Sequence, residues 1–187
     1  MNPVLDAIHQ RRSVRWYENK PIPLPILETI VQAGNAAPSG NNGQPWRFVV
    51  VTDQAFRQKL AHLALPRYKH WISRASEDLQ ARRREIDAKV MDPVYYEAPA
   101  IIFVLGGGMS SDLDCPMACL NMMLAARSLG IGSCWVYFGQ LVTDDPEIRQ
   151  ALEVKEGEKV FGPIVLGYPR GEFPEAPAKK APAIKWI

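Results

Sequence analysis

Two neighbouring apolar segments in the middle of the chain constrain its fold most strongly. Residues Ala100–Leu105 are aliphatic or aromatic without interruption, which is typical of a strand that is buried on both faces. From Asp114 to Leu129 apolar residues occupy nearly all sides of a helical pattern, and Gly130 ends the helix. A helix that is apolar on all sides has to be shielded from water by other parts of the protein. We therefore expect it inside the protein or at a contact between subunits.

The remaining segments alternate irregularly between helical and strand-like patterns. Helical patterns begin at Asn2, Pro25, Asp53 and Asp145, and strand patterns cover residues 46–52, 133–138 and 160–166. Residues 66–97 are polar and mostly helical in pattern. No repeat or linker divides the chain, and its helices and strands do not alternate regularly. This organisation predicts one α+β domain over residues 1–187.

The composition excludes several classes of protein. With 47% apolar and 22% charged residues, the chain has the composition of an ordinary globular protein. A formal net charge of +2 is too small to predict bulk attraction to nucleic acid or to an anionic membrane. The strongest apolar run, residues 99–105, is far shorter than the roughly 20 residues that span a bilayer, and no export signal is visible. We expect a cytoplasmic protein.

The cysteines and histidines match no metal-binding or nucleophilic pattern. The three cysteines, Cys115, Cys119 and Cys134, are odd in number and lack CxxC spacing. Neither an HExxH motif nor a recognisable grouping of serine, histidine and aspartate occurs. We therefore expect no metal centre and no catalytic triad.

A basic cluster follows the first helix. Three arginines and a serine lie within five residues, as Arg11, Arg12, Ser13 and Arg15. Guanidinium groups pair with phosphate oxygens through two parallel hydrogen bonds, and a serine hydroxyl adds a neutral donor. The same residues also suit a solvated helix end, where cations complement the helix dipole. Considered alone, the cluster favours the solvated end.

Two other segments are rich in turn-forming residues. The loop Ala37–Pro45 offers many amide and hydroxyl groups directly before a strand, which suits the hydrogen-bonding edge of a planar heterocycle such as a flavin. An ordinary turn-rich connection has the same composition. Farther along, Gly130 and Gly132 follow the apolar helix and permit a close backbone approach, or simply end the helix.

Together, in this order and spacing, these segments resemble the nitroreductase-like FMN enzymes. The family pattern has an RRSxR opening, a loop of the type APSxxNxQPW, a buried alanine-rich helix ending in GxGSCW, and a last strand followed by a basic, proline-rich tail. All of these parts are present, and the resemblance covers almost the whole chain. Residues 66–97 match least. The resemblance implies a nitroreductase-like α+β fold: a central mixed β-sheet flanked by helices, with an extended C-terminal tail that embraces the partner subunit of a homodimer.

The resemblance also implies roles for individual residues. The phosphate and ribityl chain of FMN would be held by the opening motif, Arg11, Arg12, Ser13 and Arg15. The isoalloxazine ring would be lined from the partner subunit by the loop residues Pro38, Ser39, Asn42 and Gln44. The backbone at Tyr137 and Phe138 would lie beside flavin atoms N5 and O4. Lys180, with Lys179 beside it, matches the tail's phosphate contact. Many relatives have arginine there, and lysine keeps the charge but lacks the planar fork.

The implied activity is the transfer of electron pairs from NADH or NADPH to nitroaromatic, quinone or related organic acceptors by a ping-pong mechanism. The cofactor performs this chemistry, so no catalytic side chain is expected. Two alternatives remain: a specialised enzyme on the same scaffold, of the dehalogenase or flavin-fragmenting type, and a flavin-binding protein without turnover. Four aromatic residues of the polar segment could either cap the flavin and select acceptors or serve in packing, namely Tyr68, Trp71, Tyr95 and Tyr96.

Overall fold

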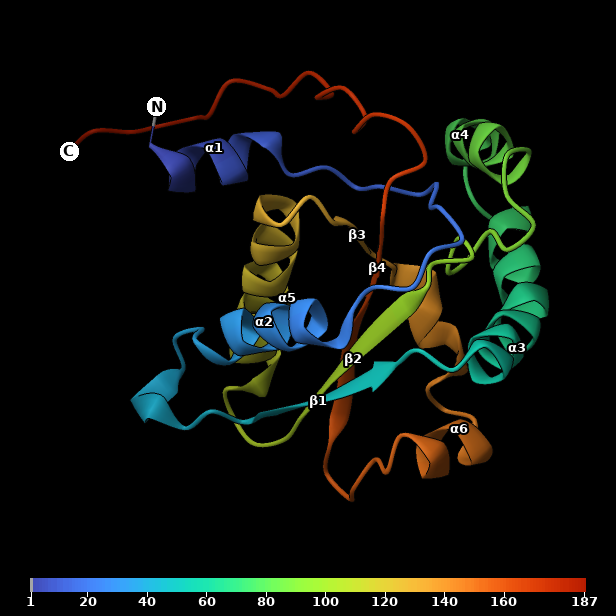
Figure 1. Ribbon diagram of the computed structural model, residues 1–187, viewed down its shortest axis with the longest axis horizontal. Coiled ribbons are helices and arrows are strands. Elements are labelled where there is room, and N and C mark those ends of the chain that lie inside the picture. The colour runs from blue at the N-terminus through green and yellow to red at the C-terminus, as the bar shows by residue number, and fades with distance from the viewer. Residues whose placement is uncertain (1) are drawn as a thin grey trace.

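The computed structural model describes residues 2–187 and is built around one four-stranded sheet (Figure 1). Its strands, in the spatial order β1-β2-β4-β3, are β1 (Trp46–Val51), β2 (Ala100–Gly106), β4 (Lys159–Gly167) and β3 (Gly132–Trp135). All three pairs of neighbouring strands are antiparallel. The expected mixed sheet is therefore wrong for these four strands. The described residues contain parallel pairing only as an isolated bridge between Ser13 and Ser133, because the segment after the first helix touches the edge strand at a single residue pair.

The central strand β2 explains why the sheet is covered on both sides. Successive side chains of a strand point to opposite faces. Accordingly, Ile101, Phe103 and Leu105 belong to one hydrophobic cluster, and Ala100, Ile102 and Val104 belong to the other. All six side chains are buried. The uninterrupted apolar run is thus a strand buried on both faces, as its sequence predicted.

Helices cover the two faces of the sheet (Figure 1). The cluster that contains Ala100 is shared with α2 (Leu24–Asn35) and α5 (Ser111–Ser128), and the cluster that contains Ile101 is shared with α3 (Gln54–Ser73) and α6 (Pro146–Ala151). The remaining helical segments are α1 (Pro3–Gln10), α4 (Glu77–Asp87) and two 3-10 turns, η1 (Gly40–Asn42) and η2 (Tyr137–Val142). We call α4 and the segment up to Glu97 the lid.

Three of the predicted helix starts are confirmed by capping hydrogen bonds. The side chains of Asn2, Asp53 and Asp145 each accept a hydrogen bond from a backbone N–H of the first helical turn, at 2.9, 2.7 and 3.0 Å. Other boundaries differ. The apolar helix begins at Ser111 rather than Asp114, and the strand expected over 133–138 ends at Trp135. There Val136 N–H bonds to the carbonyl of Pro163 and the chain then turns into η2.

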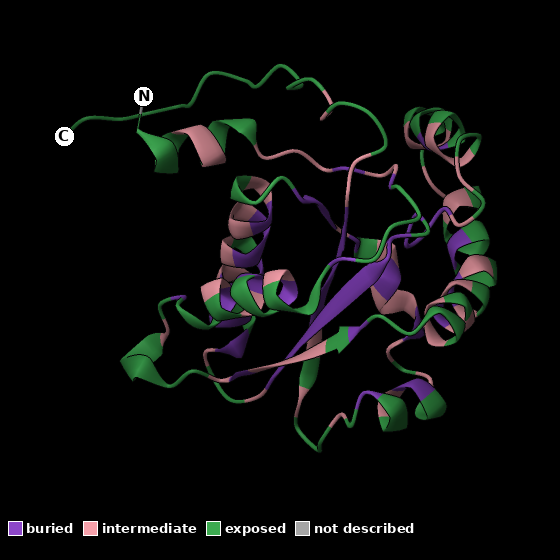
Figure 2. Ribbon diagram, in the orientation of Figure 1, coloured by how far each residue is buried: buried purple, intermediate pink, exposed green. Residues whose placement is uncertain are grey.

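Two apolar segments remain uncovered within the chain. No residue of α1 is buried, and its apolar stripe of Val4, Leu5 and Ile8 is exposed. Beyond β4 the chain runs as an extended tail past α1, and it is exposed along almost its whole length (Figure 2). The tail ends with Ile184, Trp186 and Ile187 exposed.

Two kinds of feature are absent from residues 2–187. No helix there combines the length and the apolar character needed to cross a membrane. No group of three or more His, Cys, Asp or Glu side chains in the same range is arranged to hold a metal ion.

Candidate functional site

The arginine segment, residues 11–15, lies against the open edge of the sheet. Val14 N–H donates to the carbonyl of Ser133 over 3.0 Å, and the Val14 side chain is buried. A Cβ atom at Gly132 would lie 2.9 Å from the Val14 side chain, so the close approach requires glycine. Gly130 has a φ of 73° and ends α5 in the left-handed conformation. The glycine pair therefore both terminates the helix and admits the arginine segment.

The guanidinium groups of this segment have no acidic partners. The ion pairs found among residues 2–187 include none of Arg11, Arg12 or Arg15. Arg12 Nη1 donates only to backbone carbonyls nearby, those of His9 and Arg11, at 2.6 and 2.8 Å. The Nε atoms of Arg12 and Arg15 are buried without any hydrogen-bond partner. Such buried donors cost stability, which points to an anionic ligand as their missing partner.

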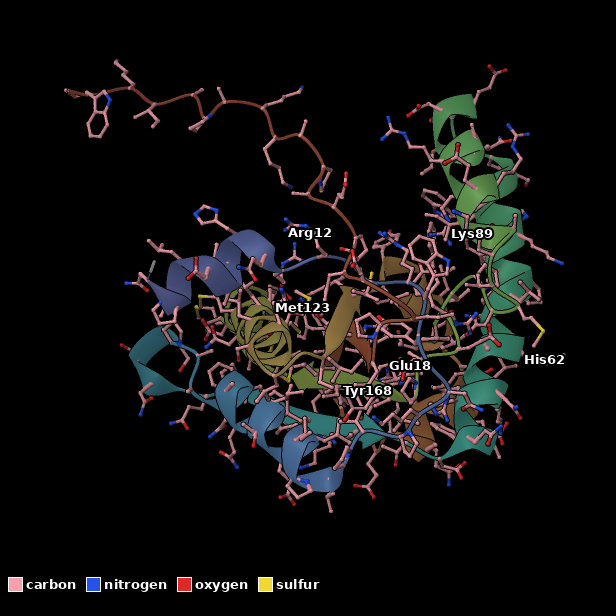
Figure 3. All side chains as sticks on the ribbon, turned by 45° about the horizontal axis from the view of Figure 1, so that its top comes forward. Arg12, Glu18, His62, Lys89, Met123 and Tyr168 are labelled. Atoms are coloured by element: carbon pink, nitrogen blue, oxygen red, sulfur yellow. The ribbon has the colours of Figure 1, made fainter. Side chains whose placement is uncertain are left out.

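The Cys134 thiol and the Tyr17 hydroxyl, which lie near the arginine segment, carry no negative charge that would neutralise it. Burial raises the pKa of the Cys134 thiol, against the opposing effect of the nearby guanidiniums of Arg15, Arg11 and Arg83. Burial likewise raises the pKa of Tyr17, whose hydroxyl donates to the Val14 carbonyl over 2.6 Å. Both groups are therefore uncharged near neutral pH. Figure 3 shows the Arg12 side chain between the end of α1 and the start of the tail.

The amide-rich loop lies in another part of the subunit. Residues 37–45 contain η1, which is well separated from the end of α1 in Figure 1. The loop is held locally: Gln44 N–H donates to Ser39 Oγ over 3.0 Å, and Gly40 N–H donates to Asp114 Oδ2 over 3.2 Å. Asn42 and Gln44 have positive φ angles of 55° and 43°. One chain therefore does not bring Pro38, Ser39, Asn42 and Gln44 to the arginines, and their predicted place in a partner's site stays a prediction.

Tyr137 and Phe138 open η2, so their backbone N–H groups have no partner inside that helix. Their rings form an aromatic cluster with two side chains of α3. The ring of Phe138 lies 5.0 Å from those of Tyr68 and Trp71, in edge-to-face contact. A hollow of about 720 Å³ beside this cluster is lined by Pro66, Arg67, His70, Trp71, Gln140, Leu141 and Asp144.

The predicted basic contact of the tail is not made within the chain. Lys179 and Lys180 are exposed, and they take part in none of the ion pairs found among the described residues. Their role as phosphate ligands stays a prediction.

The sequence interpretation missed Arg83, which is buried at 6% exposure in the middle of a charged helix. It touches Tyr68, Tyr96 and Phe138. Arg83 lies within the run Arg82-Arg83-Arg84, a pattern that predicts a solvated, charged helix face. The available signal was its spacing from Leu79 and Ile86, four and three residues away on the same helical face.

Comparisons with known proteins show which family the chain is similar to. The nitroreductase family model matches residues 8–168. A nitroreductase from Bacteroides fragilis, solved with bound FMN, is 34% identical, with a TM-score of 0.79 and coverage of 100% of both chains. An Archaeoglobus fulgidus protein, named for NADH dehydrogenase or NAD(P)H nitroreductase activity, is 31% identical over 92% of this chain and 88% of its own length.

A relative with a different name is also found. Iodotyrosine deiodinase 1 from Sus scrofa is 23% identical over 93% of this chain and 64% of its own length. Relatives with different reactions therefore share this fold. The matched residues span the arginine segment, the whole sheet and the lid, so the chain belongs to the nitroreductase family.

Proposed function

We propose that this chain is a single FMN-binding domain that works as a homodimer and transfers electron pairs from NADH or NADPH to a nitroaromatic, quinone or related organic acceptor. The observation that carries the proposal is the pair of buried, unpartnered Nε atoms of Arg12 and Arg15. A phosphate group supplies oxygens of the right charge and geometry for such donors. The bound FMN of the similar Bacteroides fragilis structure supports FMN as its source.

The residues of this chain fit that cofactor. Arg11, Arg12, Ser13 and Arg15 would hold its phosphate and ribityl chain, with Lys180 and Lys179 of the tail adding charge. The N–H groups at Tyr137 and Phe138, which have no partner inside η2, would donate to the flavin edge, where hydrogen-bond donors stabilise added electron density. When bound, FMN supplies the two-electron redox chemistry. The protein binds and orients it and limits the access of water.

A second copy of the chain supplies what one subunit lacks. Exposed apolar side chains of α1 and α5 would be covered in a dimer: Val4, Leu5, Ile8, Leu113, Leu120 and Leu129. Two-fold symmetry would bury this surface twice and would bring Pro38, Ser39, Asn42 and Gln44 of each subunit to the partner's flavin. The tail, with its exposed apolar end, would cross onto the partner.

The acceptor would lie over the aromatic cluster of Tyr68, Trp71, Tyr137 and Phe138. Trp71 and Tyr137 are 38% and 60% exposed, and Trp71 lines the hollow beside α3. Flat aromatic acceptors stack well on such rings. The same exposed flavin face would serve donor and acceptor in turn, which requires ping-pong kinetics.

The test is anaerobic addition of NADH or NADPH to the purified yellow protein, followed by a panel of nitroaromatic, quinone and halogenated aromatic acceptors. We expect prompt bleaching of the flavin absorbance, recovery with a nitroaromatic or quinone, and parallel double-reciprocal plots. Chromatography should identify the released flavin as FMN. A persistent oxidised spectrum would instead favour a flavin-binding protein without turnover. FAD as the released flavin would refute the cofactor assignment.

The iodotyrosine deiodinase relative gives specific support to a second candidate, a reductive dehalogenase on the same scaffold. The two candidates differ in the acceptor panel. Recovery of the oxidised spectrum with a halogenated phenol, accompanied by halide release and absent with nitroaromatics, would select the dehalogenase.

A further inference from the structure

Arg83 is the only buried residue of α4, whose other residues are exposed or half-buried. Burying a guanidinium group is costly unless its charge and its donors are matched. The side chain of Arg83 is nevertheless 8% exposed, so its surroundings have to offset that cost. Those surroundings are supplied by Asp87 of α4 itself and by three other segments, which are α3, residues 93–96 and η2.

The guanidinium group of Arg83 is hydrogen-bonded on every nitrogen. Its Nε donates to the hydroxyl of Tyr68 over 2.8 Å, its Nη1 donates to the hydroxyl of Tyr96 over 2.9 Å, and its Nη2 donates to the carbonyl of Pro93 over 2.6 Å. Asp87, one turn later in α4, lies 3.2 Å from Nη2 and supplies the opposite charge. Burial alone would lower the pKa of Arg83, but the contacts with Tyr96 and Tyr68 raise it above its usual value. The group is therefore a permanent buried cation.

The same group stacks against the aromatic cluster. Arg83 Cζ lies 5.0 Å from the ring centre of Tyr68 and 5.3 Å from that of Phe138. Tyr96 has two cations near it, since Arg83 Cζ and Arg15 Cζ lie 5.8 and 6.0 Å from its ring centre. Arg83 thus links α4 both to Phe138 and, through Tyr96, to the arginine segment.

The backbone at Tyr96 is strained, which shows that its position is held by its contacts. Tyr96 and Glu97 have φ angles of 58° and 55°, in the left-handed region that bulky side chains disfavour. Such strain persists only where the surroundings fix it, and it gathers at functional sites. The hydrogen bond from Arg83 is the fixing contact at the Tyr96 hydroxyl.

We propose that Arg83 is a positioning residue that latches the lid onto the Phe138 side of the cofactor site. The proposal rests on the proposed function, because the site it closes is the FMN site. With the latch formed, Arg83 holds α4 against Tyr68 and Phe138, and Phe138 and Arg15 are held in the positions that would meet the flavin. Without the latch, α4 loses the contacts of its one fully buried side chain, and the contacts with Phe138 and Arg15 loosen.

The experiment combines hydrogen–deuterium exchange with FMN affinity, measured on apo and FMN-loaded protein. The variants are Arg83→Met, Arg83→Lys and the matched control Arg84→Met, which changes the neighbouring exposed arginine. In Arg83→Met we expect amides of residues 77–97 to exchange at least tenfold faster, with exchange in β2 unchanged, and FMN to bind about tenfold more weakly. Arg83→Lys should be intermediate, because lysine keeps the charge but its single ammonium nitrogen cannot reproduce the planar arrangement of the donors on Nε, Nη1 and Nη2. Arg84→Met should match the wild type.

Unchanged exchange across residues 77–97 in Arg83→Met would overturn the latch. If that variant does not fold, Tyr96→Phe decides, since it removes one hydrogen bond and keeps the ring. It should speed exchange in α4 several-fold, and wild-type exchange there would overturn the proposal. The exchange result on apo protein stands even if the wild type binds no FMN, an outcome that would refute the proposed function alone.

Discussion

Arg47 and the arginine segment have opposite surroundings in the same molecule. Arg47, on β1, forms a forked pair with Glu158, with Nε–Oε1 and Nη2–Oε2 distances of 2.9 and 2.7 Å, and it also reaches the carbonyls of Leu152 and Glu153. Arg12 and Arg15 bond only to carbonyls of residues 9–13, and each leaves a buried Nε without a partner. The first arrangement is complete within the fold, whereas the second leaves buried donors that the proposed FMN phosphate would complete.

This contrast predicts that the two kinds of arginine act on different quantities. Replacing Arg47 should change the stability of the fold, and replacing Arg15 should change the affinity for FMN. A paired arginine contributes to the unfolding free energy through contacts that already exist. An unpartnered one contributes nothing until its ligand arrives.

The largest effect on stability is expected for Arg47→Met. The variant leaves Glu158 and the two carbonyls without their partner in a half-buried position, so the free energy of unfolding should fall by about 2–3 kcal/mol. Urea unfolding of apo protein measures it. The control is Arg82→Met, which breaks an exposed pair with Asp78 and should change stability by under about 0.5 kcal/mol. A loss of FMN affinity in Arg47→Met at equal folding would contradict the separation of the two roles.

Arg15→Ala should have the opposite profile. Losing a charge-assisted contact to phosphate costs about 1.5–3 kcal/mol of binding, so FMN affinity should fall tenfold or more, measured by quenching of flavin fluorescence. The apo protein should be about as stable as the wild type, because removing an unpartnered buried donor offsets the loss of the long hydrogen bond from Arg15 Nη1 to the Ser13 carbonyl. Arg84→Ala is the control and should keep its flavin. If both variants retain FMN equally, the arginine segment is not the phosphate site.

Local features of the fold were predictable from the sequence, and pairings between distant segments were not. The buried strand at Ala100 and the caps at Asn2 and Asp53 depend on residues that are close in sequence, and all three are confirmed. The antiparallel pairing of the sheet is not encoded locally, so the expected mixed sheet was wrong. The helix start at Ser111 was missed because the three residues before Asp114 lack a strong apolar pattern.

The residues of the candidate site also differ in whether the sequence could predict them. The motif around Arg15 is contiguous, so the sequence identified it, although only the structure shows its unpartnered donors. Arg83 depends on hydrogen bonds to Tyr68, Tyr96 and Pro93, which are ten or more residues away, and a charge run gives no sign of them. The roles predicted for the loop at Ser39 and the tail at Lys180 involve a second subunit, so a single chain does not test them.

Removing residues 178–187 tests the part of the proposed phosphate site that lies outside the fold. Lys179 and Lys180 are exposed, so their contribution to FMN binding should be about 1 kcal/mol, a roughly fivefold loss of affinity. The truncation should also weaken the dimer, because it removes the apolar end of the tail, as light scattering would show. The double variant Lys179→Ala/Lys180→Ala should lose affinity but keep the dimer. A truncated protein that remains a dimer with full FMN would make the tail a surface appendage.

The smallest effect concerns the pH dependence of the Arg47 pair. The hydrogen bond from Arg47 lowers the pKa of the Glu158 carboxyl below its ordinary value of 4.5. A carboxyl with a lowered pKa in the folded state stabilises the protein above its unfolded pKa, and this contribution is lost as the pH falls through the folded pKa. The difference in unfolding free energy between the wild type and Arg47→Met should therefore be constant from about pH 5 to 8 and should shrink below about pH 4.5. Urea unfolding of both proteins over this range cancels the titration of all other groups. The corresponding difference between the wild type and Arg15→Ala should stay near zero throughout, since Arg15 has no carboxylate partner. A difference for Arg47→Met that persists undiminished to about pH 3 would show that Glu158 is not the partner through which Arg47 stabilises the fold.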